Sequence, residues 1–168
     1  MNYKQVEFHW SSKALQYQDD RAGIETDDLN FAFYRTRCEQ EILLKLIAGQ
    51  PRNSALEVGC GNGRLSNWLA HYYKYVSGID ISAEMIRLAR QKAPPNVEYY
   101  QSRAEDWVGQ SAYDFILFSG MFQYLEDEDA IRALENANSS FIISRDTQSK
   151  RLSFRHDGDY PVIDLKNT

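Results

Sequence analysis

The sequence predicts an α/β fold with a doubly wound, mostly parallel sheet, and three observations support this. Apolar segments of strand length alternate with amphipathic segments of helical period between residues 54 and 145. Gly59, Gly61 and Gly63 stand at every second position directly behind the first of these strands, and Asp80 ends the next one. Strands that alternate with helices imply right-handed crossovers, and ligands of such sheets lie beyond the carboxyl ends of the strands.

Length and composition fit one soluble domain covering residues 1–168. The chain has a formal net charge of −5 and 26% charged residues, and this acidic balance argues against a nucleic-acid surface. Its two cysteines, Cys38 and Cys60, lie far apart and without a metal-ligand pattern, and no apolar run reaches membrane-spanning length. We therefore expect a cytoplasmic protein with no metal, no membrane contact and no nucleic-acid partner.

The N-terminal segment, residues 1–30, is expected to be irregular, with short helical possibilities. It carries scattered aromatic residues among polar ones, which either pack against the domain or cover a ligand as a lid. Packing is favoured slightly, and for His9 and Trp10 in particular. Tyr17, which has polar neighbours, is the best candidate for a lid.

Residues 31–48 show a strong helical period. Gly49 and Pro51 end this helix. The face expected to be buried carries Phe31, Tyr34, Cys38, Ile42 and Leu46, with Leu43 and Ile47 beside them. Arg35 and Arg37 lie on the same helix away from that stripe, where arginines are usually solvated.

The first strand, Ala55–Val58, runs into the glycine turn and then into an amphipathic helix carrying Leu65, Trp68, Leu69 and Tyr72. Glycine lets the backbone approach a ligand closely, and the N–H groups at a helix start attract anions. The turn therefore indicates a nucleotide-type site. The alternative is a plain strand-to-helix connection.

The second strand, Tyr75–Asp80, ends on an acid about twenty residues beyond the first glycine. A carboxylate at this place can accept both ribose hydroxyls of an adenosine. Ser82 is a predicted N-cap, and the buried face of the following helix carries Met85, Ile86 and Ala89.

Three further strands are predicted. Asn96–Tyr100 follows the helix-breaking Pro94-Pro95, and the fully apolar Tyr113–Phe118 suits a central parallel strand. A helix with acidic residues in its first turn then runs from about Glu126 to Asn136, before a fifth strand at 141–144.

Glu57 and the three glycines together resemble motif I, E/D-x-G-x-G-x-G, of the class I S-adenosylmethionine (SAM) dependent methyltransferases, in their small-molecule branch. The dinucleotide pattern G-x-G-x-x-G of dehydrogenases would need glycine at Arg64. The resemblance implies the strand order 3-2-1-4-5.

Two later segments extend the resemblance. Gln101–Trp107 is similar to motif III, G-D/N-A-E, but Arg103 stands where the family has an acid or amide, and it could lay its plane against the adenine. Ser119–Asp127 is similar to motif IV. A basic residue on the first long helix sometimes meets the cofactor carboxylate in this family, and Arg37 is the candidate. The implied cofactor contacts are Glu57, Gly59, Gly61, Asp80, Ile81, Met85, Arg103, Ala104, Glu105, Phe118 and Ser119, with Tyr17 as the lid.

The resemblance implies an enzyme that methylates an oxygen or nitrogen of a small molecule, with SAM as cofactor and S-adenosylhomocysteine (SAH) as product. The catalytic residues stay unknown, because no base stands out among His9, His156, Glu126 and Asp127, and His71 is expected to be structural. The alternative is a non-catalytic SAM- or SAH-binding domain that acts as a partner or regulatory subunit.

The C-terminal part is shorter than in the resembling family, where a helix and strands 6 and 7 follow strand 5. After Ser144 there are 24 residues (168 − 144), enough for one hairpin of 152–154 against 161–163, so strands 6 and 7 are expected to be absent or reduced. The edge of strand 5 would then be open. We expect either that the tail folds back across this edge or that two copies of the chain form a homodimer there.

Overall fold

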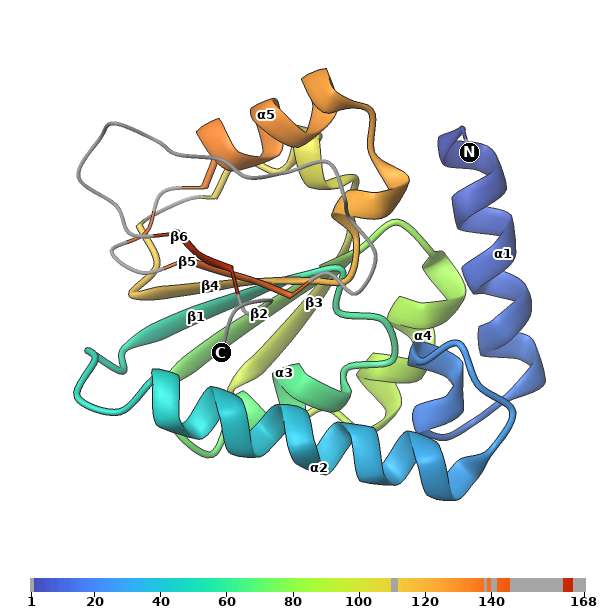
Figure 1. Ribbon diagram of the computed structural model, residues 1–168, viewed down its shortest axis with the longest axis horizontal. Helices are drawn as coiled ribbons and strands as arrows, with labels where there is room; N and C mark the ends of the chain where they lie inside the picture. Colours follow the sequence, from blue (N-terminus) through green and yellow to red (C-terminus); the bar gives the residue numbers. More distant parts are fainter. Residues whose placement is uncertain (1, 110–111, 138, 140–141, 146–161, 165–168) are drawn as a thin grey trace.

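A six-stranded sheet forms the centre of the protein (Figure 1). The computed structural model describes residues 2–109, 112–137, 139, 142–145 and 162–164. The strands lie in the order β3-β2-β1-β4-β5-β6, and every neighbouring pair is parallel. This confirms the predicted order 3-2-1-4-5. The strand bounds are Ser54–Val58 for β1, Tyr75–Asp80 for β2, Val97–Gln101 for β3, Phe115–Ser119 for β4, Ile142–Arg145 for β5 and Val162–Asp164 for β6.

Helices cover both faces of the sheet, as a doubly wound fold requires (Figure 1). Helices α2 (Leu29–Leu46), α3 (Arg64–Leu69) and α4 (Ala83–Gln91) lie on one face, and α5 (Asp127–Glu135) lies on the other. Helix α1 (Tyr3–Gln16) stands beside α4 at one end of the sheet. Three short 3₁₀ turns complete the described part: η1 (Asp20–Gly23), η2 (Ala104–Asp106) and η3 (Phe122–Tyr124). Within that part of the chain, no helix combines the length and apolar character needed to cross a membrane.

The two central strands, β1 and β4, are apolar on both sides because each side faces a helix layer. Phe115 and Leu117 of β4 pack into the core beneath α2, α3 and α4, whereas Ile116 and Phe118 pack against α5. All four side chains are almost fully buried. The resulting sandwich leaves the carboxyl ends of the strands as the place where loops can form a site.

Residues 1–30 are not irregular, because most of them form α1 and η1. Asn2 and Gln5 form a capping box at the start of α1: the Asn2 side chain accepts the N–H of Gln5, and the Gln5 side chain accepts the N–H of Asn2. Within the helix only Val6 and Ala14 are buried. Two buried residues are too few to give a helical period in the sequence. The Asn2–Gln5 capping box is the feature from which this helix could have been predicted.

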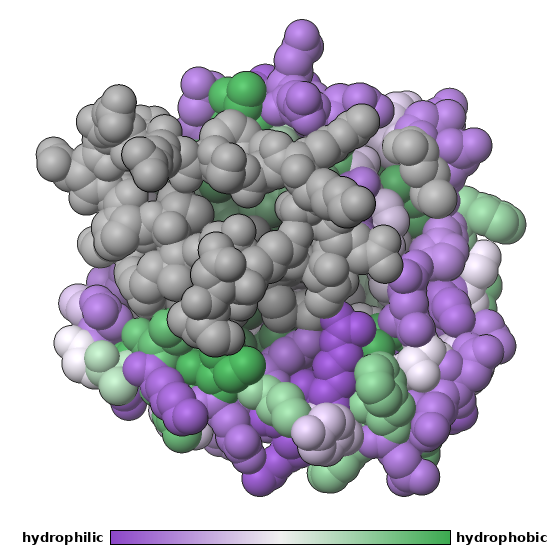
Figure 2. All heavy atoms as spheres, viewed as in Figure 1, coloured by the Kyte–Doolittle hydropathy of each residue, from purple (hydrophilic) through white to green (hydrophobic). Residues whose placement is uncertain are grey.

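The predicted buried face of α2 is wrong in its aromatic part, although the helix itself is present. Phe31 is 51% exposed and Tyr34 is 67% exposed, whereas Leu43 and Ile47, expected beside that face, are buried. The other buried residues of the helix are Ala32, Thr36 and Glu39. Glu39 and Thr36 both contact Arg64 at the start of α3, so polar pairing turns this face inward. Hydrophobic residues consequently appear on the surface along the edge where α2 lies (Figure 2).

Strand β6 lies along the outer edge of β5, with Ile143 opposite Ile163. The C-terminal tail thus folds back across this edge, which is one of the two predicted alternatives. The other half of the predicted hairpin, residues 152–154, lies outside the described residues. Pairing of two copies through this end of the sheet stays a prediction.

Replacing Glu39 tests the inward polar face of α2. The side chains of Arg64 and Glu39 are 6% and 9% exposed, and removing one partner of a buried ion pair costs about 3–5 kcal/mol. We expect Glu39→Gln to lower the free energy of unfolding, measured by urea denaturation, by about 3 kcal/mol. Glu84→Gln removes an exposed pair with Arg87 and should change it by less than about 1 kcal/mol. Equal effects of the two substitutions would contradict this account.

Candidate functional site

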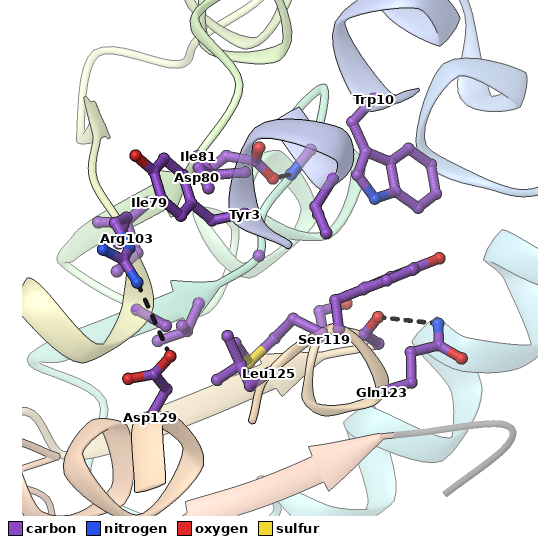
Figure 3. Close-up of a pocket in the computed structure, with 18 of the residues that line it drawn as sticks. Tyr3, Trp10, Ile79, Asp80, Ile81, Arg103, Ser119, Gln123, Leu125 and Asp129 are labelled. Carbon is purple, nitrogen blue, oxygen red and sulfur yellow. Dashed lines mark hydrogen bonds and ion pairs between the residues drawn. The ribbon is translucent and has the colours of Figure 1, made fainter. Parts of the chain in front are cut away.

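A cavity of about 300 Å³ lies at the carboxyl ends of the strands, where the chain order reverses between β1 and β4. Open α/β sheets bind their ligands at this switch point. The glycine turn, the end of β2 and the segments that follow β3 and β4 each contribute to its walls. Helix α1 and the chain after η1 close it from the side (Figure 3).

The glycine turn brings bare backbone to the cavity. Gly59, Gly61 and Gly63 all have positive φ angles, of 78°, 53° and 80°. The N–H groups of Gly59 and Cys60 both donate to the Ile79 carbonyl at 2.9 Å, which joins the turn to β2. A Cβ on Gly61 would have only the Gly23 Cα within 4 Å, at 3.7 Å. Gly61 therefore borders open space, where a side chain would take room from a ligand.

Asp80 connects the two βα units. Its Oδ2 accepts the N–H of Gly61 at 2.9 Å, and its Oδ1 accepts the N–H of Ser82 at 2.9 Å. Burial raises the pKa of this carboxyl above its ordinary value, and the two backbone N–H groups oppose that rise. Each oxygen keeps further acceptor capacity toward the cavity that Asp80 lines. The residue is placed to receive a pair of hydroxyl groups.

Arg103 is held by carboxylates and covered by a ring. Its guanidinium pairs with Glu105 and lies 3.7 Å from Asp129 Oδ2. The Tyr3 ring lies over it, 4.7 Å from guanidinium carbon to ring centroid. Figure 3 shows Tyr3, Arg103 and Asp129 together at one end of the cavity. Arg103 was expected to lay its plane against the adenine, and in the structure its guanidinium lies against the Tyr3 ring.

Most of the predicted contacts come together around the cavity. Those that line it are Gly59, Gly61, Asp80, Ile81, Arg103, Ala104, Glu105 and Ser119. Glu57 does not line it, because its carboxylate is buried and accepts the Ser66 hydroxyl at 2.5 Å, which fixes the start of α3. Phe118 points into the core and stacks on Phe122 at 4.9 Å. These two predicted contacts are structural.

Two further predicted positions also lie away from the cavity lining. Met85 is fully buried between α4 and α1, in a cluster with Ala14 and Leu88. Tyr17 donates its hydroxyl to Asp27 at 2.7 Å, and its ring lies beside the Arg21 guanidinium. Tyr17 does not line the cavity, whereas Tyr3, Val6 and Trp10 of α1 do.

Several residues that line the cavity were not predicted from the sequence. Arg35, rather than Arg37, faces the cavity from α2. Ile24 and Glu25 reach it from the chain after η1, and Tyr124 reaches it from η3. They lie in or next to 3₁₀ turns or, for Arg35, on a helix beside its apolar stripe. Periodicity gives no signal for such positions, since it reports buried faces.

Comparisons with known proteins agree with this geometry. Residues 55–140 match the family described as "Methyltransferase domain". The trans-aconitate 2-methyltransferase of Azoarcus sp. strain BH72 is 34% identical over 101 residues, which are 59% of this chain and 39% of that protein. Nodulation protein S of Sinorhizobium fredii is 34% identical over 103 residues, 60% of this chain and 47% of that protein. The chain therefore spans less than half the length of these relatives.

Solved structures share the fold. The DhpI–SAH complex superposes with a TM-score of 0.64 at 25% identity, over 80% of this chain and 61% of that one. The phosphoethanolamine N-methyltransferase 1 of Haemonchus contortus, solved with phosphoethanolamine and SAH, has a TM-score of 0.74 over 92% of this chain and 34% of that one. At 16% sequence identity, this similarity supports the fold and no more.

Two glycine substitutions distinguish Gly61, which borders the cavity, from Gly63, which packs against Tyr99. A Cβ on Gly63 would lie 2.4 Å from the Tyr99 hydroxyl, whereas one on Gly61 would make an ordinary contact of 3.7 Å with the Gly23 Cα. Alanine in the left-handed region costs about 1–2 kcal/mol by itself. We expect Gly61→Ala to lower the free energy of unfolding by that amount, and Gly63→Ala to lower it by several kcal/mol more, in denaturant titrations. Equal losses would show that Tyr99 does not restrict this turn.

Proposed function

The chain belongs to the class I SAM-dependent methyltransferases, and we propose that it transfers the methyl group of SAM to a small-molecule acceptor. One observation carries the proposal: Asp80 and the bare backbone of Gly59 and Gly61 border one cavity at the switch point of the sheet. The trans-aconitate 2-methyltransferase relative is a methyltransferase by name, and residues 55–140, which match the methyltransferase family, include Gly59, Gly61 and Asp80.

The lining residues fit the parts of SAM. Asp80 is placed for the ribose hydroxyls, because each of its oxygens has acceptor capacity beyond one backbone N–H. Gly59 and Gly61 leave room for the amino-acid end, whose carboxylate would share the Arg35 guanidinium with Glu39. Ile81 and Ala104 offer apolar surface for the adenine.

When bound, SAM supplies an electrophilic methyl group on a positively charged sulfur. The leaving group is a neutral thioether, so the protein needs no acid to assist it. What the residues of the chain contribute is orientation of the acceptor and exclusion of water, which together can supply several kcal/mol. Helix α1 serves the second task, because Tyr3, Val6 and Trp10 close the side of the cavity.

The experiment is calorimetry with SAH, followed by transfer of tritium-labelled methyl from SAM to pooled small molecules. We expect SAH to bind at one site and label to appear in an acceptor pool. SAH binding without transfer to any acceptor would favour a non-catalytic SAM-binding domain. A chain that binds neither SAM nor SAH would refute the proposal.

Asp80→Asn should weaken SAH binding, because a neutral amide replaces a charge-assisted acceptor. A loss of about 1.5–3 kcal/mol corresponds to roughly tenfold or more in the dissociation constant. In the unsubstituted chain, affinity should fall as the pH drops through the raised pKa of Asp80, since protonation removes the charged acceptor, with a midpoint above the ordinary 3.8. Calorimetry across pH checks both points. An unchanged affinity in the variant would contradict the role of Asp80.

A further inference from the structure

Trp10, Tyr124 and Glu25 form a wall of the cavity to which no part of the cofactor has been assigned. The Trp10 and Tyr124 rings meet edge to face with centroids 6.1 Å apart. Figure 3 shows Trp10 and Gln123 at the end of the cavity away from Arg103 and Asp129. Resting on the proposed function, we infer that this wall binds the acceptor, and that the acceptor is a small amine whose ammonium group meets Glu25.

The position of Glu25 is set by two neighbours. Its Oε1 accepts the Tyr124 hydroxyl at 3.4 Å and lies 3.3 Å from His9 Nε2. Within the described part of the chain, no lysine or arginine forms an ion pair with it. The side chain is 57% exposed, so the carboxylate remains open to the cavity.

The charge balance of the cavity favours a cation at this wall. Arg35 donates to Glu39 at 3.0 Å, and Arg103 pairs with Glu105 and Asp129, so both arginines of the lining already face carboxylates. Glu25 adds negative charge, with the His9 imidazole rather than a lysine or arginine as its partner. A carboxylate or phosphate acceptor would meet repulsion here, whereas an ammonium group gains Coulomb attraction.

The aromatic rings strengthen this preference. Ring faces attract cations by about 0.5–2 kcal/mol, depending on how far the site is desolvated. Trp10 and Tyr124 both border the cavity next to Glu25. A carboxylate beside two rings suits an ammonium group, which gains a charge–charge attraction and a cation–π contribution that a neutral hydroxyl lacks.

The reaction is consistent with this chemistry. The bound ammonium group first gives a proton to water, and the freed lone pair then forms the bond to the methyl carbon. The carbon–sulfur bond pair stays with sulfur, so the positive charge passes from sulfur to nitrogen. Glu25 faces the atom that becomes positive, and a carboxylate fixed there stabilises the developing charge.

Binding of matched probes to the SAH-saturated protein tests the inference. Phenethylamine, phenethyl alcohol and hydrocinnamate share a ring and a short chain but carry an ammonium, a hydroxyl and a carboxylate head. We expect calorimetry to show phenethylamine binding about tenfold more tightly than either of the others, the factor expected of one charge-assisted contact. Hydrocinnamate or phenethyl alcohol binding as tightly as the amine, or no measurable binding of the amine, overturns the inference.

Glu25→Gln and Glu128→Gln form a matched pair of variants. Glu128 lies exposed on α5 outside the cavity lining, so both substitutions remove one negative charge and only Glu25→Gln removes it from the cavity wall. Only Glu25→Gln should lower the affinity for phenethylamine, again by about tenfold, with SAH affinity and phenethyl alcohol binding unchanged. A fall in SAH affinity in Glu25→Gln would assign this residue to the cofactor and overturn the inference.

The two proposals fail in different ways. If the unsubstituted chain does not bind SAH, the methyltransferase function itself fails. If SAH binds and the amine shows no preference, the function stands and only the acceptor class is wrong.

Discussion

One partly buried carboxylate joins the parts of the site. Asp80 accepts the N–H of Gly61 on one oxygen and the N–H of Ser82 on the other, so the glycine turn after β1 and the start of α4 are fixed to the same group. Ser82 in turn caps α4 through the Met85 N–H and contacts Ser11 of α1 at 2.9 Å. The glycine turn, α4 and α1 are therefore connected through Asp80 and Ser82. The desolvation that raises the pKa of Asp80 is the cost of this arrangement.

A second polar network holds the chain before α2 against the same turn. Asp20 of η1 accepts the Thr36 hydroxyl at 2.8 Å, and Thr36 and Glu39 both contact Arg64 directly behind the glycines. The Asn62 side chain donates to the Asp19 carbonyl at 2.8 Å. These polar contacts fix the position of η1 and α2 relative to the glycine turn. Glu25 follows η1 in the chain, so its place in the cavity depends on them.

The sequence was informative where burial and backbone conformation dictate residue type. β1 to β4, the positive-φ glycines and the acid at the end of β2 all lie where their pattern predicted. Side-chain direction was harder to predict. Glu57 and Phe118 sit beside the site in the chain, yet the alternation of a strand turns both into helix-covered layers. On α2, the aromatic stripe of Phe31 and Tyr34 looked buried, but the ion pair of Glu39 selects the opposite face. Pairing between distant residues leaves no periodic signal.

Helix α1 is docked with little buried apolar surface, since Val6 and Ala14 are its buried residues. The same helix supplies Tyr3 and Trp10 to the cavity wall. A molecule that contacts these rings therefore adds its own interaction energy to the attachment of α1, and by reciprocity an attached α1 raises the affinity for that molecule by the same amount. The affinity for this molecule and the detachment of α1 are two measures of one coupled equilibrium. Amide exchange along α1 would thus report the occupancy of a site that its backbone does not touch.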